Sequence, residues 1–100
     1  MSYTATEVTR IGLSGGESLA IIDVSPDAAT GSITISDATS VKVVGVVSLI
    51  EDPAANAQVQ VQAKENGSTA NQIDIKLWQA SNSAAATNFK DFRLLVKIIR

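Results

Sequence analysis

Few side chains in this 100-residue chain are of the kinds that carry chemistry in proteins. It contains neither cysteine nor histidine, which excludes disulfides, thiol nucleophiles, Cys/His zinc sites and histidine acid–base catalysis. Glu51 and Asp52 are adjacent, but the spaced acidic pattern of a calcium loop does not occur. Other aspartates stand beside expected turns, where they accept local hydrogen bonds. We therefore predict no metal site and no catalytic carboxylate pair.

Two short glycine motifs also have an ordinary structural explanation. Gly15-Gly16 lies between two expected strands rather than before a helix, so it predicts a hairpin turn and not a phosphate-binding loop. Asn66-Gly67-Ser68 matches a glycosylation acceptor, but Asn-Gly is itself a strong hairpin signal. Serine is plentiful, yet no arrangement with lysine or aspartate is singled out. We predict that the protein is not an enzyme and binds no cofactor.

Two aromatic residues are candidates for binding. Trp78 shares the outward side of its expected strand with Asp74 and Lys76. It could stack against a sugar, anchor a subunit interface, or be covered by a neighbouring loop. Tyr3 falls in residues 1–6, which we expect to form an extended N-terminal arm. It could be disordered there, or it could anchor on a neighbouring subunit.

The charge balance restricts the classes of partner. Lysine and arginine number 8 against 10 aspartates and glutamates, and the net charge is -2, so we predict no nucleic-acid binding. No run approaches the ~18 apolar residues that span a bilayer, and the start MSYTATEVTR lacks the apolar core of a secretory signal. Charged residues make up 18%, below the roughly 25% of a typical soluble domain. Such a composition suits packing against neighbouring subunits.

The elements that must position these residues are strands, since apolar residues recur with period two. The expected strands are residues 7–13, 17–24, 32–36, 41–50, 58–65, 72–79 and part of 88–100. Gly45 predicts a bulge, and Pro26 after Ser25 allows a single helical turn. About seven short strands separated by turns predict one all-β domain over residues 1–100, an antiparallel β-sandwich or small β-barrel.

The last strand raises the question of what covers its second face. Alternate residues Phe92 to Ile98 share one face, but Leu95 and Ile99 interrupt the other. A sandwich of this length covers only one face of each strand. Burying even 300 Å² of apolar surface favours association by roughly 7 kcal/mol before entropy is subtracted. We therefore predict a homo-oligomer whose subunit interface includes Trp78, Leu95, Ile99 and, as a weaker contact, Tyr3.

Several stretches together resemble the small all-β decoration, or cement, proteins of tailed bacteriophage capsids. They are the polar start, the Val-rich SVKVVGVVSLIED, the hairpin NG…NQIDIKLW and the final FKDFRLLVKIIR. The resemblance implies a structural virion protein, made in the host cytoplasm and bound on the capsid surface. It also implies a trimer or dimer that contacts the major capsid protein or other virion proteins.

Two other functions stay open at this point. One is a small carbohydrate-binding or adhesion module that uses Trp78 and the loop SNSAAATN at 81–88. The other is a different phage component, such as a head or tail joining protein.

Overall fold

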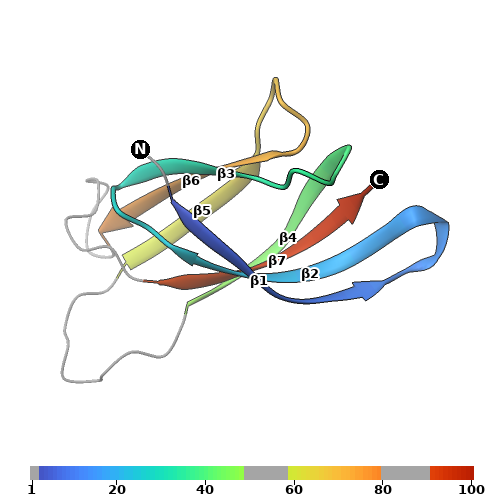
Figure 1. The fold of residues 1–100 in the computed structure, drawn as a ribbon. Coiled ribbons are helices and arrows are strands. Elements are labelled where there is room, and N and C mark those ends of the chain that lie inside the picture. Colours follow the sequence, from blue (N-terminus) through green and yellow to red (C-terminus); the bar gives the residue numbers. More distant parts are fainter. Residues whose placement is uncertain (1–2, 49–58, 80–90) are drawn as a thin grey trace.

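The computed structural model describes residues 3–48, 59–79 and 91–100 and folds them as two antiparallel β-sheets (Figure 1). The strands are β1 (Thr4–Gly12), β2 (Glu17–Ser25), β3 (Thr30–Thr34), β4 (Ser40–Ser48), β5 (Val59–Glu65), β6 (Gln72–Gln79) and β7 (Phe92–Ile99). This confirms the predicted all-β class and, of the two architectures considered, the sandwich.

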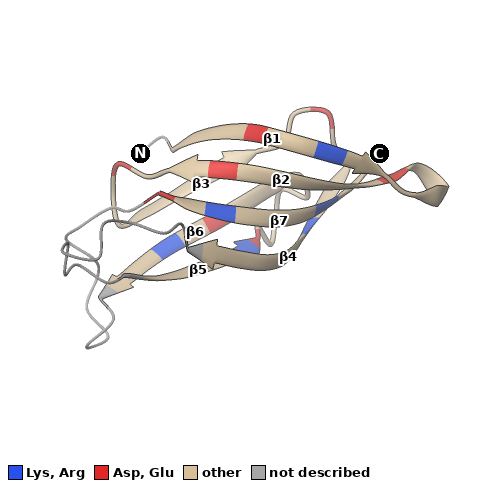
Figure 2. Ribbon diagram, turned by 90° about the horizontal axis from the view of Figure 1, so that it is seen from below, with Lys and Arg blue, Asp and Glu red and all other residues tan. Residues whose placement is uncertain are grey.

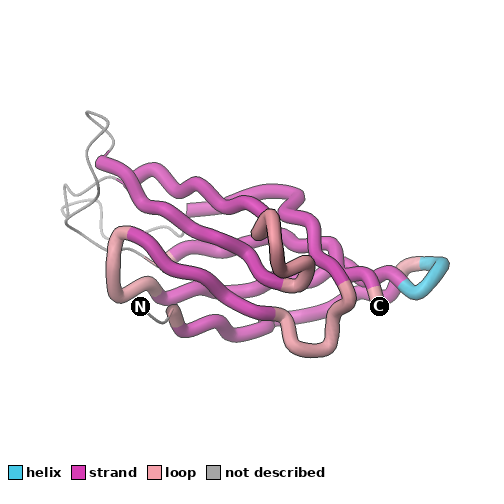
Figure 3. Tube along the Cα trace, turned by 90° about the horizontal axis from the view of Figure 1, so that it is seen from above, coloured by secondary structure: helices cyan, strands magenta, loops and turns pink. Residues whose placement is uncertain are grey.

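The two sheets form the layers of the sandwich (Figure 1) and overlie each other in the view from above (Figure 3). One has four strands in the order β1-β2-β7-β4, and the other has three in the order β3-β6-β5. Every neighbouring pair is antiparallel. The last strand of the chain, β7, therefore lies inside the larger sheet, and its outward face has neighbours on both sides.

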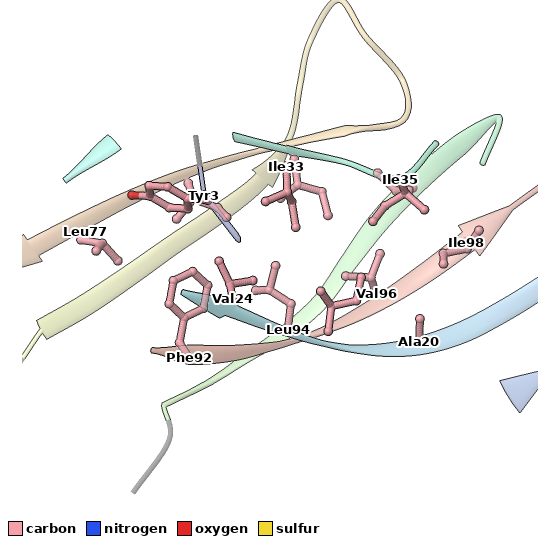
Figure 4. Packing of buried hydrophobic residues seen from close by; sticks show 14 residues of the cluster. Tyr3, Ala20, Val24, Ile33, Ile35, Leu77, Phe92, Leu94, Val96 and Ile98 are labelled. Carbon is pink, nitrogen blue, oxygen red and sulfur yellow. The ribbon is translucent and has the colours of Figure 1, made fainter. Parts of the chain in front are cut away.

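The core lies between the sheets and follows the predicted alternation (Figure 4). In β7 every second residue from Phe92 to Ile98 is at most 1% exposed, and in β6 Ile73, Ile75 and Leu77 face them from the other sheet. Successive side chains of a strand point to opposite faces, so one face of each strand fills this single core.

Tyr3 and the residues after it are placed differently from the expected arm. β1 begins at Thr4, so residues 4–6 are paired with β2, while Tyr3 is only 8% exposed and packs in the core. Its hydroxyl donates a hydrogen bond of 2.6 Å to the carbonyl oxygen of Ala28. The prediction of an extended arm is therefore wrong from Tyr3 onward, because the tyrosine ring is buried within its own protomer. Residues 1–2 lie outside the described part.

Three predicted turn features have different outcomes. Gly15 and Gly16 both have positive φ, 78° and 77°, and the turn between β1 and β2 closes with a 2.8 Å bond from the Leu13 amide to the Glu17 carbonyl. Asn66 also forms a turn, but through its side chain, which accepts 2.8 Å bonds from the amides of Ser68 and Thr69. The helical turn predicted near Pro26 is absent, and residues 27–29 form bends that lead into β3.

Candidate assembly surface

The outward face of the four-stranded sheet carries neighbouring apolar side chains. The strand register places Ile11 opposite Leu19 and Ile21 opposite Leu95, all on this side of the sheet. We call the apolar side chains gathered here the apolar face. Its members are Ile11, Leu19, Ile21, Val44, Val47, Leu95 and Ile99.

Several members of the apolar face are open to solvent. Ile11 is 56% exposed, Val44 57% and Val47 55%, whereas Leu95 and Ile99 are half-buried. Among the described residues, nothing folds over these three exposed side chains. Large contiguous apolar patches are uncommon on monomeric soluble proteins, and they mark interaction sites.

Two ion pairs lie on the same side of the sheet and flank Ile21 and Leu95. Arg93 donates two hydrogen bonds to Asp23, at 2.6 and 3.1 Å, and Lys97 Nζ lies 3.0 Å from Glu17 Oε2. The hydrogen bonds from Arg93 lower the pKa of Asp23 and raise the pKa of Arg93 itself. Figure 2 shows the resulting pattern, with acidic residues on β2 beside basic residues on β7.

The four predicted interface residues occupy three separate environments. Leu95 and Ile99 belong to the apolar face, as the interrupted alternation of β7 suggested. Tyr3 lies in the core and is not a surface anchor. Trp78 lies on β6, opposite Gln60 of β5, and therefore on the outward face of the other sheet. The structure brings together only Leu95 and Ile99.

The surroundings of Trp78 are polar. Its indole N–H donates a 2.8 Å hydrogen bond to Gln62 Oε1, and Lys76 Nζ lies 4.1 Å from the centroid of its ring. Gln62 and Lys76 also line an open depression of about 830 Å³, together with apolar residues that include Val46, Val61 and Ile75; Trp78 is not part of its lining. The lysine occupies one face of the ring by a cation–π contact, so that face is not free to stack on a sugar.

Val47 points outward, although uninterrupted alternation along residues 41–50 predicts that it shares a face with Val41 and Val43. The register of β4 against β7 shifts between Val43 and Gly45, so Val46 points inward, opposite Leu94, and Val47 points outward, opposite Arg93. Gly45 had indicated a bulge. A bulge adds one residue to the strand and reverses the inward and outward alternation after it, which places Val47 on the outward side.

Residues 3–48, 59–79 and 91–100 contain no group of three acidic side chains that could hold a metal ion. In the same part of the chain, no helix has the length and apolarity required to cross a bilayer. The predicted sugar-binding loop at 81–88 lies outside the described residues.

Comparisons with known proteins give no match. Neither a protein-family model, nor a curated protein, nor a solved structure is similar to this chain.

Proposed function

We propose that this protein is a non-enzymatic structural subunit of a larger particle, of the phage capsid decoration kind. The observation that carries the proposal is the apolar face, with three large aliphatic side chains more than half exposed. Other proteins of the particle, the major capsid protein among them, are its partners in this proposal, and the virion surface is its location.

The physical basis is the gain from covering apolar side chains. Each square ångström of apolar surface removed from water contributes about 25 cal/mol. Four of the charges beside the apolar residues are paired within the protomer, Asp23 with Arg93 and Glu17 with Lys97. Lys42, on β4 opposite Lys97, is exposed. A neighbouring subunit can therefore cover β2 and β7 without burying an unpaired charge, which would oppose association.

Composition and sequence resemblance support the particle as the setting. The 18% charged fraction leaves many neutral polar side chains, which can be buried at repeated contacts at low desolvation cost. The outward side of the three-stranded sheet follows this pattern, with Thr30, Gln60 and Gln62 among its residues. The resemblance to decoration proteins favours the capsid surface over a head or tail joining position.

The test is to find the protein in particles. Phage-type particles from the source of this sequence would be banded on a density gradient, and their proteins identified with an antibody raised against the purified chain. We expect the protein to band with the shell protein and to be seen on the shell by cryo-electron microscopy. Finding it only in the soluble fraction, away from every particle band, contradicts the proposal.

A carbohydrate-binding module is the second candidate, because Gln62 and Lys76, which contact the partly exposed Trp78, also line an open depression. Titrating the protein with a glycan panel while following tryptophan fluorescence tests it directly. A saturable shift that disappears in a Gln62→Ala, Lys76→Ala variant supports sugar binding. The absence of a shift with every glycan of the panel contradicts it.

A further inference from the structure

We infer that the partner of the apolar face is the same face of a second copy, related by a two-fold axis parallel to β2 and β7. The inference rests on the proposed function, because it names the partner that covers the assembly surface. It depends on the order of charges along two neighbouring strands.

The acidic and basic groups of this face are separated by strand. Glu17 and Asp23 stand on β2, whereas Arg93 and Lys97 stand on β7. A further basic residue, Lys42, stands on β4 opposite Lys97. The register places Asp23 directly opposite Arg93, with Ile21 opposite Leu95 two residues further along. One strand therefore presents an acidic column and its neighbour a basic column, with an apolar pair between the charges.

A two-fold axis that runs between β2 and β7 places β2 of each copy over β7 of the other. Asp23 of one copy then faces Arg93 of the other, and the same contact occurs twice. The four charges alternate in sign around the axis, while Ile21 of each copy meets Leu95 of the other. Two sheets packed face to face keep their strands within about 30° of each other, which this arrangement allows.

An axis across the strands gives the opposite result. It places β2 on β2 and β7 on β7, so that the acidic column meets itself and the basic column meets itself. Like charges set against each other across an interface oppose association. An isologous contact on this face is therefore favourable only with the axis parallel to the strands.

The area of the apolar face indicates how strong the self-association should be. Strands about 4.8 Å apart and a rise of about 3.4 Å per residue give four strands of eight residues a footprint of about 520 Å². This is about two thirds of the roughly 800 Å² per partner in a standard stable interface. We expect a dimer that forms in the micromolar range and is reinforced when copies are held together on a particle.

The decisive experiment exchanges the acidic residue of β2 and the basic residue of β7 at one pair of facing positions, 23 and 93. The double variant Asp23→Arg, Arg93→Asp keeps the ion pair within the protomer and also the alternating charges of a homodimer. Its self-association, measured by sedimentation, should stay within about threefold of that of the original protein. A mixed dimer of one original and one variant protein sets acidic side chains against acidic ones and basic against basic. The amount of this mixed dimer should therefore be about tenfold or more below the amount expected from random pairing.

The exchange is measured by native mass spectrometry on an equal mixture of the two proteins. One protein carries ¹⁵N, because the double variant has the same mass as the original chain. Leu95→Asp should abolish dimers, and its melting curve reports whether it folds. The matched control, Gln60→Asp, adds the same charge to an exposed position on the other sheet and should leave the dimer unchanged.

Three results overturn the inference. They are statistical mixing of the two proteins, stronger association of the double variant than of the original, and a monomeric original protein up to about millimolar concentration. None of them contradicts a particle role, in which a different protein covers the face. Conversely, suppose that each protein pairs only with its own kind in the mixture but that the protein is absent from every particle band. This result would contradict the proposed function alone.

Discussion

At the scale of single residues, the contact between Tyr3 and Gly31 ties the start of the chain into the sandwich. The ring of Tyr3 lies directly over Gly31, and a β-carbon at that glycine would overlap it. Burial raises the pKa of the Tyr3 hydroxyl, with a smaller contribution from Asp27, because the phenolate would lose its hydration. Tyr3 therefore acts as a neutral core residue and hydrogen-bond donor.

Adding one methyl group at this glycine tests the contact. We expect Gly31→Ala to lower the free energy of unfolding by about 1–3 kcal/mol, because the tyrosine ring must move. Urea denaturation with tryptophan fluorescence measures the change. Gly45→Ala is the control, since no atom lies within 4 Å of its β-carbon position and its φ is not positive. Equal losses for both variants would contradict the assigned contact.

At the scale of the elements, the exposed edge of β4 is closed by groups from the other sheet. Glu65 at the end of β5 accepts a 2.9 Å hydrogen bond from the Val43 amide, and the Ala70 carbonyl accepts one of 3.0 Å from the Val41 amide. Unpaired edge amides are where other chains add strands. These two bonds close this part of the β4 edge to strand addition.

Removing the carboxylate tests the bond at this edge. Glu65→Ala should lower stability by about 1 kcal/mol, because the Val43 amide loses its acceptor. Glu65→Gln keeps an acceptor oxygen and should retain most of the stability at pH 7, which urea denaturation measures. Loss of the same size in both variants would show that charge, and not the hydrogen bond, accounts for the effect.

The acid response of the same variants follows from the pKa of Glu65. Hydrogen bonds from its own amide and from the Val43 amide lower this pKa in the folded state. The stabilisation is therefore present above the unfolded pKa of about 4.3 and is lost as the pH falls through the lower folded value. Between pH 6 and pH 3, Glu65→Gln should lose less stability than the original protein.

At the scale of the whole molecule, an ionic cluster joins three distant parts of the chain. Asp37, in the turn between β3 and β4, accepts a 2.7 Å bond from Arg10 of β1 and a 2.9 Å bond from Arg100. Glu7 also pairs with Arg10. The pKa of Asp37 is lowered, first by the Arg10 hydrogen bond and then by the charges of Arg10 and Arg100.

We predict that Asp37 contributes to loss of stability in acid. Because its folded pKa is below its unfolded value, its contribution is present above about pH 4 and disappears as the pH falls through the folded pKa. Asp37→Asn should be less stable than the original protein at pH 7 and should approach it at pH 3, as measured by urea midpoints. Asp27→Asn is the control, since Asp27 is exposed and forms no ion pair with a described residue. An equal difference at both pH values contradicts the prediction.

The sequence alone was sufficient for the fold class and for much of the strand pattern. Alternation with period two is a local property, so it predicted β2 and β6 to within one residue at each end and a last strand within residues 88–100. The positive φ of Gly15 and Gly16 was predictable for the same reason, since a glycine pair between strands favours such a turn. The extra apolar residues of β7, Leu95 and Ile99, also indicated that its outward face carries a patch.

Only the tertiary structure decided which faces meet and which residues are hidden. Strand order depends on contacts between distant segments, so nothing local places β7 between β2 and β4. The bulge at Gly45 reverses the alternation after it and turns Val47 outward, and Tyr3 is buried because Gly31 leaves room for its ring. The same pairing sets an acidic strand beside a basic one, because charges on β2 and β7 become neighbours only when those strands pair.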